Sequence, residues 1–423
     1  MYISILGIVG IGLVAWGALE KERLYELPFL MGVMVLTYLV PRLVGASFAA
    51  DQMPTGAYER VAIMTILCTG AVYVGYKLPR RPTRYLQWTY DKGRLFWAAL
   101  VLTGIGAVSH ILLDQLPPSV WQGQPSGIVV AVLFFTKITY YGLATAVFAY
   151  LKTREKRFLL LALLCLFFIF PALVQGLRRV QIAKTAFILG LALWFCWEKI
   201  PPRALAIPVL LFAFFLGTSA IGELRGAAAD EAGITLRELK SIQWTATIEQ
   251  KVLSERNSVM VAAHQMALVE EHDRYDLGIF HWNRMVHKYV PNQVFGDSFV
   301  NAVFLEVNDE STVVKATDFN EQTYHQYGYR KPLGTTTTGM RDSYGSFGYF
   351  GFIKFMLAAA IMKVLYVSAR RGSLTHQILY ALLLAYALHI ASHNTNWFFA
   401  EFPHLAIFLL PALWYARSGT RRP

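Results

Sequence analysis

Four arginines and one lysine are the residues of this sequence best suited to chemistry. Arg178 and Arg179 lie in the link "PALVQGLRRVQIAKTAF" between two apolar runs, and Lys184 follows on the same expected helix. Arg225, in "IGELRGAAAD", and Arg341, in "TTTTGMRDSYGSFGYFGF", stand near the two ends of a long hydrophilic segment. Guanidinium groups fit phosphate oxygens in bidentate pairs. Convergence of these side chains at one depth would therefore make a site for a phosphate-bearing ligand.

A simpler interpretation of Arg178 and Arg179 is that they snorkel to lipid headgroups from a helix end. Lys184 argues against this headgroup interpretation. Arg178, Gln181 and Lys184 lie at i, i+3 and i+6 and therefore on one stripe of the expected helix. A lysine inside a membrane span costs about 2–3 kcal/mol on insertion scales, and is tolerated where it faces a bundle interior or a wet cavity. The stripe predicts a positive cavity that opens outward.

Transfer of a group to a hydroxyl would also need a general base. Histidine suits this role near neutral pH. Candidate bases in or beside the hydrophilic segment are Glu223, His264, His272, His281, His287, His325 and Asp342. Among these we predict Glu223, His281 and Asp342 as catalytic.

The stretch "LGIFHWNRMVHKYVP" places His281, Arg284 and His287 at i, i+3 and i+6. Trp282 beside them could stack on a sugar ring, and an interfacial helix anchored by its aromatic residues is the competing interpretation. In the re-entry stretch we expect Asp342 to orient Arg341, and Tyr344 to contact sugar or phosphate. The alternative is a helix start where Gly345, Gly348 and Gly351 allow close helix packing.

The elements that must position these residues are membrane helices. The chain has 423 residues, and 55% of them are hydrophobic. Apolar runs long enough to span a bilayer lie near 2–19, 28–47, 60–77, 95–113, 127–151, 158–176, 180–197, 204–221, 346–367, 376–391 and 403–416. We therefore predict an all-α polytopic membrane protein with about 11 transmembrane helices.

Basic residues alternate between the links of these runs. One set of links holds nearly all the lysines and arginines, whereas "DQLPPSVWQGQPSG" and "SHNTNWFFAEF" of the other set carry none. By the positive-inside rule the N-terminus lies outside and the C-terminus in the cytoplasm. The expected domains are a bundle over 1–221, a large extracytoplasmic loop domain over 222–345 and further helices over 346–423. The loop domain is partly helical, with Val252, Val259, Ala263, Met266 and Val269 spaced for one apolar face.

Several function classes are excluded by what the sequence lacks. The net charge of +12 is concentrated in short links, which indicates membrane topology and no nucleic-acid partner. Neither a nucleotide-binding GxxxxGK[ST] loop nor an HExxH motif occurs. His389 and His393 at i and i+4 lack an evident third ligand, so we predict no metal and no cofactor.

The "GLRR" turn, the "TGMRDSYGSFGYFG" re-entry and the large late loop resemble the Wzy-type oligosaccharide repeat-unit polymerases, which share their architecture with O-antigen ligases. The resemblance implies a GT-C-like glycosyltransferase of the bacterial inner membrane, making O-antigen or exopolysaccharide on its periplasmic face. It would transfer a glycan from undecaprenyl diphosphate to a sugar hydroxyl of another lipid-linked repeat unit, without metal and with inversion. Arg178, Arg179, Lys184, Arg225 and Arg341 would then hold the diphosphate, and Trp282 and Tyr344 the sugar.

The resemblance also implies the partners: membrane lipid, a flippase and a chain-length regulator. Two other functions stay open. One is an O-antigen-type ligase with a different acceptor. The other is a flippase or exporter of lipid-linked glycans, although transporters commonly show two related halves and this sequence shows no such repeat.

Overall fold

The computed structural model describes residues 1–79, 81–116, 128–174, 179–199, 202–211, 257–273, 275–290, 295–305, 316–332 and 335–418. Its regular structure in these ranges is helical, apart from one isolated bridge between Tyr90 and Arg417. Eight helical stretches of the described chain are long and apolar enough to cross a membrane. The protein is thus an all-α, multi-pass membrane protein by helix length and hydropathy, as predicted.

The helices of the first half are α1 (Tyr2–Leu19), α2 (Leu27–Met34), α3 (Val40–Ser47), α4 (Ala57–Lys77), α5 (Lys92–Asp114), α7 (Ile128–Thr136), α8 (Ile138–Thr153), α9 (Lys156–Val174) and α10 (Arg179–Trp197). The later ones are α14 (Ser258–Glu271), α15 (Ile279–Tyr289), α17 (Asp297–Val303), α18 (Ala316–Tyr327), α19 (Gly339–Phe347), α20 (Ile353–Arg370), α21 (Leu374–His389), α22 (Asn396–Phe399), α23 (Glu401–His404) and α24 (Leu410–Tyr415). Short 3₁₀ segments are η1 (Lys21–Tyr25), η3 (Ala50–Gln52) and η4 (Gly348–Phe352), and π-helical ones are η2 (Val35–Leu39) and η5 (Leu405–Leu409).

Eight of the eleven predicted spans coincide with the eight long apolar stretches. The span expected at 376–391 is α21, which is apolar but only 16 residues long. The span expected at 158–176 is the 19-residue helix α9, which contains Pro171. Of the span expected at 204–221, the structure describes only the residues up to 211.

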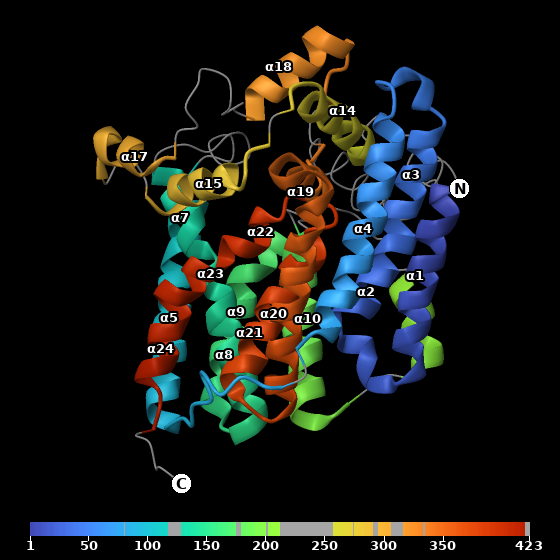
Figure 1. Ribbon diagram of the computed structural model, residues 1–423. Helices are drawn as coiled ribbons and strands as arrows, with labels where there is room; N and C mark the ends of the chain where they lie inside the picture. Colours follow the sequence, from blue (N-terminus) through green and yellow to red (C-terminus); the bar gives the residue numbers. More distant parts are fainter. Residues whose placement is uncertain are drawn as a thin grey trace, which may run out of the picture.

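The links predicted to share one side meet at one end of the bundle. Arg370 pairs with Glu22 at 3.1 Å and with Glu198 at 3.8 Å, so three of these links are in contact. Lys92 likewise pairs with Glu155 at 3.5 Å. Figure 1 shows α14, α15, α17 and α18 at the end opposite the C-terminus. The chain thus has one basic end and one end built from the late hydrophilic segment.

Two spans contain a π-helical segment just before a proline. Proline lacks an N–H, and its ring clashes with the carbonyl four residues earlier, which for Pro41 belongs to Thr37 and for Pro411 to Ile407. Both residues lie inside the π segments, η2 and η5. A wider turn at these places removes the clash without ending the span.

Close helix contacts depend on small residues, as expected where lipid gives no hydrophobic drive for helices to associate. A Cβ built on Gly75 of α4 would lie 2.1 Å from the Met356 carbonyl oxygen of α20. One built on Gly106 of α5 would lie 2.2 Å from Thr139 Oγ1 of α8. These helix pairs, α4 with α20 and α5 with α8, make the most extensive contacts of the bundle.

We expect Gly75→Ala to destabilise the protein by about 1–3 kcal/mol, because the added methyl group meets backbone that cannot rotate away. The control is Gly70→Ala on the same helix, where a Cβ meets nothing within 4 Å. Alanine is the better helix former, so this control should be neutral or stabilising. Thermal unfolding in detergent measures both. Equal unfolding temperatures for the two variants would contradict the packing described here.

Helix α14 differs from its prediction. The spacing of Val259, Ala263, Met266 and Val269 predicts one apolar face, and all four side chains are indeed buried. The rest of the helix is buried too, from Ser258 to Val269 except Met260, because α14 packs among α3, α4, α18 and α19. It is therefore part of the protein core at this end of the bundle. Val252 lies outside the described residues.

Candidate functional site

The re-entry stretch forms a short helix followed by a sharp turn. Helix α19 begins at Thr338, whose hydroxyl accepts the N–H of Arg341, and it ends at Gly348, which has φ +57°. The chain then folds back, so that a Cβ on Gly351 would lie 2.0 Å from the Ser343 carbonyl oxygen. The expected stripe of Gly345, Gly348 and Gly351 on one helix face is therefore absent, because the turn at Gly348 separates them.

Helix α15 is attached to α19 through the loop that precedes it. The N–H of Asp276 donates to the Gly345 carbonyl at 2.9 Å, and that of Leu277 donates to the Ser346 carbonyl at 3.2 Å. Asp276 Oδ1 accepts the N–H of Gly278, which has φ +91°. Leu277 has φ +48°, a conformation that costs energy for a branched side chain. These contacts hold the first turn of α15 against α19.

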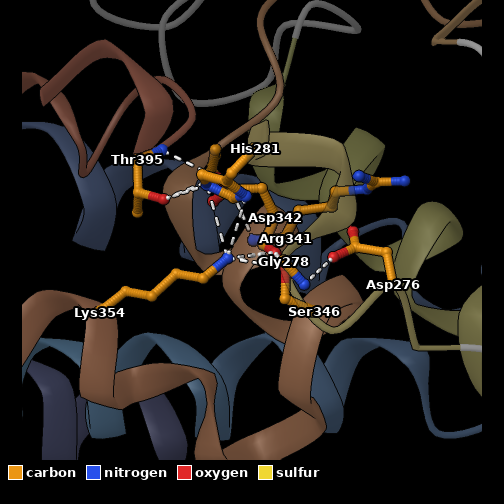
Figure 2. Close-up of polar contacts among 9 residues, drawn as sticks. Asp276, Gly278, His281, Arg341, Asp342, Ser346, Lys354 and Thr395 are labelled. Carbon is orange, nitrogen blue, oxygen red and sulfur yellow. Dashed lines mark hydrogen bonds and ion pairs between the residues drawn. The ribbon is translucent and has the colours of Figure 1, made fainter. Parts of the chain in front are cut away.

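As a result His281 of α15 meets Asp342 of α19, two residues predicted as catalytic. His281 Nε2 lies 3.0 Å from Asp342 Oδ2 (Figure 2). The same oxygen accepts the Thr395 N–H at 2.9 Å and the Thr395 hydroxyl at 2.8 Å. Asp342 is 1% exposed and the His281 side chain 13%. Because Nε2–H donates to the carboxylate, Nδ1 carries the lone pair that can accept a proton.

Lys354 completes this group from the start of α20. Its ammonium group donates to Ser346 Oγ at 2.7 Å and to the Asp342 carbonyl at 3.3 Å. It also lies 3.4 Å from His281 Nδ1 (Figure 2). The opposite charges of Asp342 and Lys354 offset each other in this group, which lowers the cost of burying them.

Beside this group is a cavity of about 40 Å³ with cationic walls. It is lined by Gln265, Phe280, Arg284, Lys331, Thr337, Arg341, Asp342 and Asn394. Three of these side chains are cationic and one is a carboxylate, so the formal charge of the lining is +2 (3 − 1). Burial, together with the charges of Arg341 and Arg284, lowers the pKa of Lys331. Such crowding of positive charge is relieved by an anion.

Other predicted residues lie elsewhere. The Tyr344 ring is 1% exposed, and its hydroxyl donates to Glu270 of α14. Trp282 is 42% exposed and donates its indole N–H to the Val303 carbonyl at 2.8 Å. Lys184 has its contacts in a second group of residues, described below. Arg178, Glu223 and Arg225 lie outside the described residues, and Arg179 begins α10 without a described side chain.

Three other histidines, His264, His389 and His393, lie apart from this group. His264 stacks on Tyr329 with ring centroids 4.0 Å apart, and its Nδ1 lies 2.9 Å from the Met260 carbonyl. Burial lowers the pKa of His264, so this ring is held neutral. His389 and His393 stack at 3.6 Å, and within the described ranges no set of three metal-ligating side chains gathers.

The second polar group lies among α8, α10, α21 and α23. Lys184 Nζ donates to the Tyr386 hydroxyl at 2.8 Å and lies over the Tyr140 ring at 4.4 Å. The Tyr141 hydroxyl lies 2.7 Å from both Glu401 Oε1 and His404 Nδ1. Lys184 is 3% exposed and Glu401 1%. Buried charges of this kind inside a helix bundle are costly and point to function.

Sequence reasoning missed several members of both groups. Lys354 carried a signal as an isolated charge in the predicted span 346–367, and Glu401 as an isolated charge among the apolar residues just before the predicted span 403–416. Lys331, Gln265 and Thr395 carried none, because nothing in their neighbouring residues distinguishes them from solvated positions of a loop or of the polar side of a helix. Arg284 was noticed only for its spacing from His281.

Comparison of the chain with protein-family models, with curated proteins and with solved structures finds no match.

Proposed function

We propose that the protein is a membrane glycosyltransferase that takes a glycan from a lipid diphosphate and joins it to a sugar hydroxyl of a second lipid-linked repeat unit. The observation that carries the proposal is the His281–Asp342 pair next to a cavity lined by Arg284, Lys331 and Arg341. A glycan leaving a diphosphate needs stabilisation of the departing negative charge, and its acceptor needs a base. The cationic side chains of the cavity would stabilise the departing charge, and His281 would act as the base.

The glycan is transferred in a single displacement at its anomeric carbon. The acceptor hydroxyl replaces Lys354 Nζ at His281 Nδ1, which takes the proton of that hydroxyl, and the oxygen forms a bond to the anomeric carbon. The bond from that carbon to the diphosphate oxygen breaks, and the electron pair leaves with the lipid diphosphate. Arg284 and Arg341 donate to the oxygens that gain charge, a kind of stabilisation for which each donor contributes about 10²–10³ in rate. Asp342 stabilises the imidazolium ion that forms.

The charge pattern supports an orientation for the site. The basic links meet at the end of the bundle opposite α14 and α15. On the positive-inside rule we assign that end to the cytoplasm, and α15 and α19 to the other side. In a bacterial inner membrane this is the periplasmic side, and the proposed donor is undecaprenyl diphosphate with its glycan. A flippase that delivers the donor and a chain-length regulator are the proposed partners.

Reconstitution tests the proposal. The purified protein in phospholipid vesicles is supplied with its lipid-linked repeat unit, and the products are separated on a gel. A ladder of regular spacing is the expected result. A single added unit on a different lipid acceptor would favour a ligase over a polymerase. Translocation of labelled lipid without any new glycosidic bond would overturn the proposal in favour of a flippase.

A further inference from the structure

The charges of three lysines act on one buried carboxylate in the second polar group. Lys137 lies at the break between α7 and α8, Lys184 on α10 and Lys288 near the end of α15. All three interact electrostatically with Glu401 of α23. The formal charge of these four side chains is therefore +2 (3 − 1), with Lys184 and Glu401 buried and Lys137 and Lys288 partly buried. Glu401 alone does not neutralise them.

The excess charge is tightest between Lys137 and Lys288. Lys288 donates to the Ala400 carbonyl at 3.0 Å, and both lysines are only partly buried, so a ligand can approach them. Burial, followed by the charge of Lys137, lowers the pKa of Lys288 to about 7. Lys184 lies deeper, between the rings of Tyr140 and Tyr386. Three ammonium groups whose charges act on one another, with two of them partly buried, favour a bound anion.

This group is connected to the first cavity through α15. Arg284, which lines the cavity, and Lys288 stand four residues apart and therefore on one face of the helix. On its other side the group adjoins α7, whose Val130 and Phe135 are exposed on the bundle surface. An amphiphile with a charged head and an apolar tail matches this arrangement of charge and exposed apolar surface.

We propose that Lys137, Lys184 and Lys288 bind the phosphate groups of a second lipid-linked diphosphate, while the cavity at Arg284 and Arg341 binds those of the first. This inference rests on the proposed function, because joining two lipid-linked repeat units brings two diphosphates to one protein. The charge of Glu401 offsets part of the charge of the three lysines and leaves a net positive charge for the ligand. The continuous face of α15 places the two lipid heads side by side, with His281 at its N-terminal end.

Binding stoichiometry tests this inference without any sugar transfer. Equilibrium dialysis with radiolabelled geranyl diphosphate, a short isoprenyl diphosphate without sugar, is performed on the protein in phosphatidylcholine nanodiscs. We expect two molecules bound per chain. The double variant K137A/K288A should bind one, and R284A/R341A should also bind one. The control is Lys92→Ala, an exposed lysine at the opposite end, which should still bind two.

One molecule per chain, unaffected by K137A/K288A, would overturn the inference. Full displacement of the second molecule by phosphatidylglycerol in the nanodisc would also overturn it, since the site would then be one for ordinary headgroups. Two bound molecules in a protein that transfers no sugar would contradict the proposed function and leave the second diphosphate site standing. The two failures are thus distinguishable.

The pH dependence of the second site supplies an independent check. Lys288 faces Lys137, Lys184 and Glu401, and it must be charged to hold the anion. Binding should be strong below pH 7 and weaken as the pH rises above 7, because Lys288 must then take up a proton first. Lys288→Arg keeps its charge throughout, so it should remove this added pH dependence. An identical pH profile for wild type and this variant would contradict the assignment.

Discussion

His281→Ala is expected to lower the rate of sugar transfer by about 10²–10⁴, the usual contribution of a general base. The variant should still bind the lipid-linked donor, because Arg284 and Arg341 remain in the cavity wall. Imidazole added to the solution should restore part of the rate, which it could not do if His281 only connected α15 to α19. Single-turnover kinetics in vesicles measure the rates, with His325→Ala on α18 as control.

The account of His281 would fail if His281→Ala transferred sugar within a few-fold of the wild-type rate. It would also fail if the rate fell and imidazole restored nothing while Asp342→Asn kept full activity. In that case the contact of His281 with Asp342 and Thr395 would serve to hold the helices together.

Glu401→Gln is expected to have the largest effect on stability. It removes a buried carboxylate whose charge acts on Lys137, Lys184 and Lys288, and a buried cation left without a counter-charge costs about 3–5 kcal/mol. Denaturant unfolding in detergent measures the loss. The control is Glu20→Gln, whose side chain is 60% exposed beside Arg23 and should change stability by less than about 1 kcal/mol.

Geranyl diphosphate should stabilise the Glu401→Gln protein more than the wild type, because the anion then replaces the missing negative charge. Stability of this variant equal to that of wild type would mean that the three lysines are not charged together around Glu401. The electrostatic argument for the second site would then fail as well.

Most of the helices could be predicted because a span is a local property of about 20 consecutive apolar residues. The two ends of the bundle followed from the links in the same way, since basic residues collect on one side. The break at Gly348 could not be predicted so simply. Gly348 has a positive φ and Gly351 packs on Ser343, whereas the helix-packing interpretation of the glycines assumed an unbroken helix.

The sequence allowed some residues of the site to be selected by their type, but it did not predict which of them contact each other. His281 and Asp342 were each selected from the sequence, but their contact depends on the hydrogen bonds of Asp276 and Leu277 with α19. Lys184 was assigned to the same site as Arg341 because both were expected at one depth. In the structure Lys184 interacts with Tyr386 and Glu401, because the rotation of α10 about its axis decides the partner and hydropathy does not report it.

The central claim is that the cations of the cavity stabilise the departing diphosphate. Its most direct test is the single-turnover rate at which reconstituted protein releases lipid diphosphate from the lipid-linked repeat unit. Wild type is compared with Arg284→Ala and Arg341→Ala, and with Arg371→Ala at the basic end as control. We expect a loss of about 10²–10³ in each cavity variant and none in the control. Wild-type rates in both cavity variants would contradict the account.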